Sequence, residues 1–128
     1  ARYMTLTWNN STEWASSAFD ETFTEDLQHK GLTDFGKQIV HKMNQLGMIV
    51  DISHVGIQTF WDVINTTTKP IMASHSSVYA LCKHQRNLND EQIKAIAKNG
   101  GVIQVNFHPG FIDPSFEEKK KLFLRTIR

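Results

Sequence analysis

The chain has little of what several protein classes require. Its 128 residues include one cysteine, Cys82, which excludes an internal disulfide and a zinc site built from cysteines. Lys and Arg total 14 against 13 Asp and Glu, so the formal net charge of +1 gives no electrostatic reason to expect nucleic acid or an anionic membrane as a partner. Apolar runs are only a few residues long, whereas a membrane span needs about 20. The composition therefore indicates a soluble globular domain.

The first residues of the sequence show no pattern typical of a targeting segment. The sequence begins Ala1-Arg2-Tyr3-Met4 and shows no basic stretch followed by an apolar one. We expect these residues to be an internal portion of a longer protein, and the cellular compartment stays open.

Short apolar runs alternate with amphipathic stretches along the chain. We expect strands over residues 2–8, 48–54, 70–75 and 102–108. We expect helices over residues 33–46, 56–64 and 89–99, and a charged one from 114 onward with Lys119, Lys120 and Lys121 on solvent. The polar stretch 9–30 has few periodic apolar positions and is expected as a functional loop.

This order predicts an α/β fold in which right-handed crossovers build a parallel sheet. A (β/α)8 barrel and a doubly wound sheet both fit the order, but a flavodoxin-like sheet would need a glycine-rich phosphate loop that the first strand lacks. Four strands are half of a barrel and leave two edges unpaired. We therefore predict that residues 1–128 form one partial (β/α)8 barrel domain, whose partner is the remaining half of the barrel.

Two histidines end neighbouring predicted strands. His54 and His75 each follow a serine and lie 21 residues apart, about one βα repeat. Equivalent strand ends meet at the barrel face that carries active sites, so the two imidazoles are placed to share one divalent metal. A single strand-end histidine more often bonds a loop, but two in register favour a metal. A zinc site needs at least three protein ligands, so the set is incomplete.

The other histidines give weaker signals. His108 ends the fourth predicted strand and is a minor candidate for a third ligand. His29, His41 and His84 are expected to be solvated side chains.

Several further polar and aromatic residues stand out. Arg86 follows His75 by eleven residues; it suits a bidentate grip on a carboxylate, although alone it would be a surface charge. Asp51 and Asn106 lie within apolar strands, so each needs a hydrogen-bond partner. Trp8 and Trp14 bracket the start of the long loop and either line a pocket or, as we prefer, anchor the loop.

The motifs resemble those of the membrane dipeptidase (renal dipeptidase) family. The similarity runs through Arg-Tyr-Met-Thr-Leu-Thr (2–7), Gly-Leu-Thr-Asp-Phe-Gly (31–36), Asp-Ile-Ser-His (51–54), Ser-His-Ser-Ser (74–77) and Gln-Arg-Asn-Leu (85–88). The paired Asp-x-Ser-His and Ser-His-Ser motifs make it specific. It covers nearly all of the chain but only a middle portion of the family's sequence.

The resemblance implies a zinc-dependent dipeptidase on a (β/α)8 barrel, in which a hydroxide bridging two zinc ions attacks the peptide carbonyl of a dipeptide. Residues matching His54 and His75 bind one of the two Zn²⁺ ions, and the one matching Arg86 grips the substrate carboxylate. The His-x-Asp pair, the bridging glutamate and a late aspartate lie outside these residues. We therefore expect this chain to be inactive alone, at most one zinc being partly liganded by it.

One position departs from the family pattern. Trp8 stands where animal members have a substrate-contacting histidine, and the Trp-Asn-Asn run is similar to bacterial members. Asn9 or Asn10 is then a candidate substitute donor in the substrate site. The competing interpretation is a non-catalytic α/β binding module or relic of the dipeptidase fold. The preferred dipeptide and a possible homodimer stay open.

Overall fold

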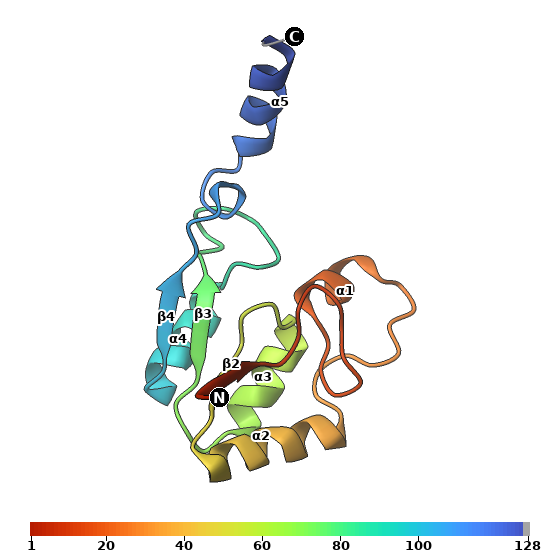
Figure 1. The fold of residues 1–128 in the computed structure, drawn as a ribbon, viewed down its shortest axis with the longest axis vertical. Helices are drawn as coiled ribbons and strands as arrows, with labels where there is room; N and C mark the ends of the chain where they lie inside the picture. Colours follow the sequence, from red (N-terminus) through yellow and green to blue (C-terminus); the bar gives the residue numbers. More distant parts are fainter. Residues whose placement is uncertain (127–128) are drawn as a thin grey trace.

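The computed structural model describes residues 1–126 and is built on a four-stranded parallel sheet (Figure 1). The strands cross the sheet in chain order: β1 (Tyr3–Thr5), β2 (Ile49–Asp51), β3 (Met72–Ser76) and β4 (Val102–Val105). Every neighbouring pair is parallel. Because successive right-handed crossovers in this order place the helices on one face, the sheet has the topology of part of a barrel and not of a doubly wound fold. The α/β prediction is confirmed.

The helix ends follow from their capping residues. The helices are α1 (Ala18–Phe23), α2 (Asp34–Leu46), α3 (Ile57–Thr66), α4 (Asp90–Asn99) and α5 (Phe116–Thr126). Thr33 caps α2 by accepting the N–H of Gly36, and Asn89 forms a capping box with Gln92 at the start of α4. Gly47 closes α2 at φ 68°, a left-handed backbone that glycine adopts without strain.

The region 9–30 differs from the prediction because it contains the helix α1. Ser17 caps this helix by accepting the N–H of Asp20, a Ser-x-x-Asp signal that was present in the sequence. The strands predicted over 2–8, 48–54 and 102–108 are shorter than expected. Their polar last residues leave the ladder to form turns, as where the Asn106 side chain accepts the N–H of His108.

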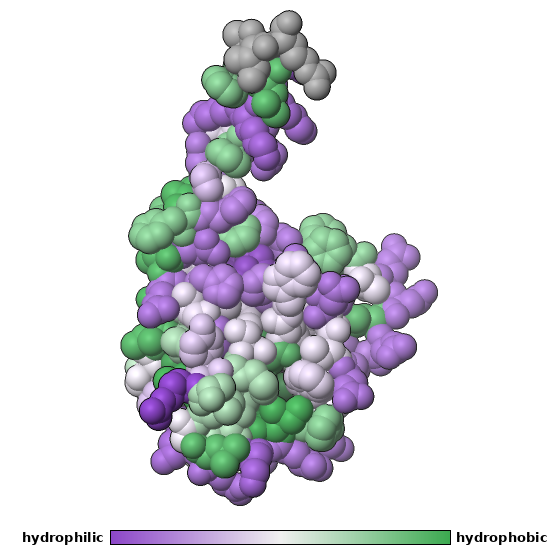
Figure 2. Space-filling model, viewed as in Figure 1, coloured by the Kyte–Doolittle hydropathy of each residue, from purple (hydrophilic) through white to green (hydrophobic). Residues whose placement is uncertain are grey.

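The hydrophobic core lies between the sheet and its helices. Val50 and Ala73 from the strands pack with Val40, Phe60 and Ile96 from α2, α3 and α4, and all five are almost completely buried. Since side chains alternate along a strand, the neighbours of these strand residues point to the opposite face. On that face Tyr3, Ile49 and Val102 are exposed, and Figure 2 shows apolar side chains reaching the surface in the lower part of the molecule.

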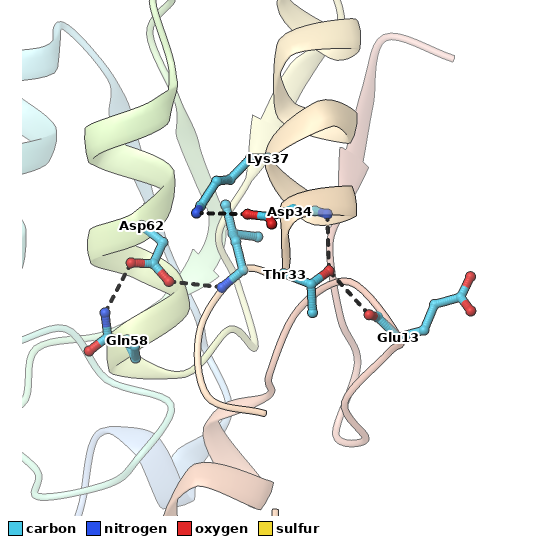
Figure 3. A network of polar contacts seen from close by, with 8 residues as sticks. Glu13, Thr33, Asp34, Lys37, Gln58 and Asp62 are labelled. Atoms are coloured by element: carbon cyan, nitrogen blue, oxygen red, sulfur yellow. Dashed lines mark hydrogen bonds and ion pairs between the residues drawn. The ribbon is translucent and has the colours of Figure 1, made fainter. Parts of the chain in front are cut away.

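A polar network fixes the start of α2 against α3 and the first loop (Figure 3). The N–H of Leu32 donates to Asp62 Oδ2 at 2.8 Å, while Gln58 on the same helix donates to Asp62 Oδ1 at 2.9 Å. The Thr33 hydroxyl donates to the carbonyl oxygen of Glu13 at 3.3 Å. These contacts hold the long first loop beside the carboxyl ends of β1 and β2.

The C-terminal helix α5 lies away from the sheet and contacts mainly the 3₁₀ turn Pro109–Phe111 (Figure 1). Lys119, Lys120 and Lys121 are exposed, as predicted. Among residues 1–126, no helix combines the length and the apolar character that a membrane span requires.

Candidate metal and substrate site

His54 and His75 meet at the carboxyl ends of β2 and β3. Their Nε2 atoms are 2.9 Å apart, and the rings lie edge to face. His54 has a φ of 71°, the only positive φ of a non-glycine residue in the described part of the chain. A side chain in this strained conformation is held there by its surroundings, a pattern that clusters at functional sites.

Both imidazoles are neutral near pH 7. Burial, together with the positive charge of Arg86, lowers the pKa of His54 to about 4. The same two causes lower the pKa of His75. Metal ligation requires the neutral imidazole, so the charge state suits a ligand pair. Two nitrogens on one tetrahedral zinc lie roughly 3.3–3.4 Å apart, close to the separation seen here.

Hydrogen bonds on the far side of each ring turn the two Nε2 atoms toward each other. His54 Nδ1 lies 3.1 Å from Asn9 Oδ1, which can only accept, and His75 Nδ1 lies 2.7 Å from Ser74 Oγ, whose own proton goes to Asp51; both Nδ1 atoms are therefore assigned the ring proton. A neutral imidazole carries one N–H, so each Nε2 then holds a lone pair. Two lone pairs that face each other across 2.9 Å form a site for a cation. Their shared metal stays a prediction.

The remaining histidines do not complete a ligand set. His108 is exposed, and its Nδ1 accepts the N–H of Gly110, although it lines a groove with His54 and His75. Within residues 1–126, no group of three or more His, Cys, Asp or Glu side chains is arranged to hold a metal ion. His41 is exposed on α2, as predicted.

Two histidines that we expected to be solvated are half-buried. His29 Nε2 lies 3.0 Å from the carbonyl oxygen of Thr12. The His84 ring lies 4.2 Å from that of Phe111, and its Nδ1 accepts the N–H of Arg86. Burial beside the Arg86 charge lowers the pKa of His84.

Arg86 is buried, with only 7% of its surface exposed, and is not the surface charge that its loop position alone suggests. Its Nη2 donates to the carbonyl oxygen of His75 at 3.3 Å, and the guanidinium lies 5.6 Å from the centre of the Phe111 ring. Nε has no hydrogen-bond partner, and neither ion pair found in residues 1–126 includes Arg86. Burial lowers its pKa to about 10, so it stays cationic. A buried cation that makes no direct ion pair, and that feels the Asp51 charge only at longer range, is suited to an anion.

A cavity of about 510 Å³ joins the two parts of the site. His54 and Arg86 both line it, with Ile57, Phe60 and Tyr79 supplying apolar walls. This volume is in the range of small-molecule sites.

The two tryptophans take different places. Trp14 donates from Nε1 to the carbonyl oxygen of Leu6 at 3.0 Å and so anchors the loop. Trp8 is 69% exposed and lines a groove with His54 and His75. Asn9 reaches His54, whereas Asn10 is exposed and, among the described residues, makes no hydrogen bond to either histidine.

Sequence reasoning missed two contributors to the site. Ser74 contacts the His75 ring directly, and the serine before each histidine was the available signal. Phe111 covers Arg86 from a turn 25 positions later in the chain, and no local pattern pointed to that contact.

The chain is similar to proteins of known sequence and structure. It is 42% identical over 111 residues, 87% of its length, to an uncharacterized dipeptidase of Schizosaccharomyces pombe, and spans 26% of that protein. The probable dipeptidase PvdM from Pseudomonas aeruginosa superimposes with a TM-score of 0.79 at 34% identity, covering 89% of this chain and 29% of PvdM.

A second solved structure shares the fold. A metallopeptidase from Rhodobacter sphaeroides, bound to a phosphinate mimic of the dipeptide L-Ala-D-Ala, gives a TM-score of 0.77 at 29% identity, covering 86% of this chain and 31% of that one. The chain thus spans less than a third of each of these three relatives. The family model of membrane dipeptidase, peptidase family M19, matches residues 1–127. The chain belongs to the membrane dipeptidase family.

Proposed function

We propose that the protein containing this chain is a zinc-dependent dipeptidase, and that these residues supply one half of its active site. The observation that carries the proposal is the pair of facing Nε2 atoms, 2.9 Å apart, beside a buried and unpaired guanidinium. A metal-ligand pair and an anion site so close together suit a short peptide with a free carboxylate. The phosphinate dipeptide mimic bound by the Rhodobacter sphaeroides relative supports the same substrate class.

His54 and His75 would hold the metal through Nε2, and they fit one because both are neutral and already oriented. When bound, zinc polarises the scissile carbonyl and lowers the pKa of water. Arg86 would bind the terminal carboxylate and so fix which end of the dipeptide faces the histidines.

Residues of the first loop would complete the substrate-facing wall. Trp8 lines the groove beside the histidines. Since Asn9 Oδ1 accepts from His54, its Nδ2 stays free to donate to substrate. Asn10 has no such contact and is the weaker candidate. The missing ligands for a two-zinc centre would come from the remaining half of the barrel, so we propose that the chain alone is inactive.

The test is dipeptide hydrolysis by the full-length protein and an Arg86→Met variant. Loss of a charged hydrogen bond should raise KM roughly 10- to 100-fold and change kcat less. Lys83→Met is the matched control, because Lys83 lines the same cavity but is exposed.

A dipeptide amide, which lacks the carboxylate, gives the second arm. The wild type should prefer the free dipeptide over the amide, and Arg86→Met should lose most of that preference. An unchanged KM in Arg86→Met would refute its role. An absence of hydrolysis in the metal-loaded wild type would favour the non-catalytic binding module.

A further inference from the structure

A buried carboxylate lies behind the histidine pair. Asp51 ends β2, is 0% exposed and accepts four hydrogen bonds. Its Oδ1 accepts the N–H groups of Ser53 and Ser74, each at 3.0 Å, and its Oδ2 accepts the hydroxyls of Thr5 at 2.6 Å and Ser74 at 2.5 Å. Four donors fill the acceptor capacity of an ionised carboxylate. No positively charged side chain is bonded to it in the described residues; hydrogen-bond donors satisfy its oxygens, and the Arg86 charge acts on it only at longer range.

These bonds fix the direction of the hydrogen-bond chain that leads to His75. A carboxylate only accepts, so the single hydroxyl proton of Ser74 points to Asp51. Ser74 Oγ must then accept from its other partner, His75 Nδ1, at 2.7 Å. The Nδ1 atom therefore carries the ring proton, and Nε2 presents its lone pair to His54.

A second contact holds the backbone of the same residue. Ser53 Oγ accepts the N–H of His75 at 3.0 Å and lies 3.3 Å from Ser74 Oγ. Asp51 thereby binds both serines that contact His75. It accepts the backbone N–H of Ser53, and both the backbone N–H and the hydroxyl of Ser74.

We propose that Asp51 is the positioning residue of the metal site and acts through Ser74 to hold His75 in the Nδ1–H form. This inference rests on the proposed metal centre and deepens it. Partners of this kind, one step removed from the metal, typically change metal affinity by about 10- to 100-fold. Asp51 itself does not touch metal or substrate.

The variant Asp51→Asn tests the proposal because it preserves the shape of the side chain and reverses the direction of the hydrogen bonds that run from residue 51 through Ser74 to His75. The amide oxygen must still accept the two backbone N–H groups, so the amide nitrogen faces Ser74 and donates to its hydroxyl. The Ser74 proton then turns to His75 Nδ1, which moves the ring proton to Nε2. That proton occupies the position between the two histidines where the metal would bind.

Two measurements on the full-length protein follow. In the metal-free protein, long-range ¹H–¹⁵N NMR of labelled histidine should report the Nδ1–H form of His75 in the wild type and the Nε2–H form in Asp51→Asn. Zinc affinity, measured by competition with a chromophoric chelator, should fall roughly 10- to 100-fold. Asp34→Asn is the control: it makes the same substitution at an exposed aspartate of α2 that pairs with Lys37 and contacts neither histidine, so both readouts should stay near wild type.

Ser74→Ala keeps the test decisive if Asp51→Asn does not fold. It removes the hydroxyl that connects Asp51 to His75 but leaves the Asp51 carboxylate its other three donors. Its zinc affinity should fall similarly, and Ser74→Thr, which restores a hydroxyl, should recover it. An unchanged His75 tautomer in folded Asp51→Asn, or zinc affinity within twofold of wild type in both variants, would overturn the proposal. Since the tautomer is read without metal, a wild type that binds no zinc would refute the proposed function and not this arrangement.

Discussion

At the scale of single residues, the site depends on side chains that the fold keeps uncharged or unpaired. His54 lies in a left-handed backbone conformation and bonds Asn9 on the far side of its ring. Arg86 lies in a cavity wall with its Nε unpartnered. Such groups are costly in a folded chain unless a ligand satisfies them, which is why they indicate binding chemistry.

The protonation of His54 provides a prediction at this scale. Its pKa of about 4 lies below the ordinary 6.5 because of burial first and the Arg86 charge second. The folded protein should therefore keep this ring neutral through pH 5, while the unfolded chain already binds the proton. Stability should accordingly rise with pH between about 4 and 6.5.

A histidine NMR titration of the metal-free full-length protein measures this directly. His54 should titrate near pH 4. A midpoint for His54 near 6.5 would contradict the burial and charge argument.

At the scale of elements, capping residues decide where the helices begin. Asn89 and Gln92 satisfy each other's backbone N–H groups at the start of α4. Asn89→Ala should therefore lower the free energy of unfolding by about 1 kcal/mol, measured by urea denaturation. Asn89→Asp, which can still cap, should restore most of the loss.

Lys94→Ala is the matched change on the exposed face of the same helix and should stay within about 0.5 kcal/mol of wild type. Equal effects of Asn89→Ala and Lys94→Ala would mean that the cap does not stabilise α4.

The elements also show how far local sequence patterns reach. Thr33, Gly47 and Asn89 act within a few residues, so the ends of α2 and α4 were predictable. The helix α1 was missed because it is only six residues long and its large apolar residues Phe19 and Phe23 are exposed, which leaves Ala18 as its buried residue.

Residues of the site divide in the same way. The close approach of His54 and His75 was predictable because one βα repeat sets their spacing, and the carboxyl ends of neighbouring strands meet in a parallel sheet. The burial of Arg86 and His84 was not, because it depends on Phe111 from a distant turn. The neutral state of both histidines likewise depends on burial and on the charge of Arg86, which arise only in the folded chain.

At the scale of the whole molecule, the sheet has one covered face and one open face. Helices cover the side of Val50 and Ala73, while Tyr3, Ile49 and Val102 are exposed on the other. Both β1 and β4 are edge strands in the four-stranded sheet. We propose that the remaining half of the barrel, from the rest of the protein, closes this face, since the chain spans 26% of its fungal relative.

We propose that His54 and His75 hold a metal ion in a dipeptidase. The most direct test is zinc per molecule, by elemental analysis of the full-length protein, in the wild type, in His75→Ala and in His41→Ala as a control on exposed α2. We predict close to two zinc ions in the wild type and the control, and loss of about one ion with nearly all dipeptide hydrolysis in His75→Ala. Full zinc content and turnover in His75→Ala would contradict the account.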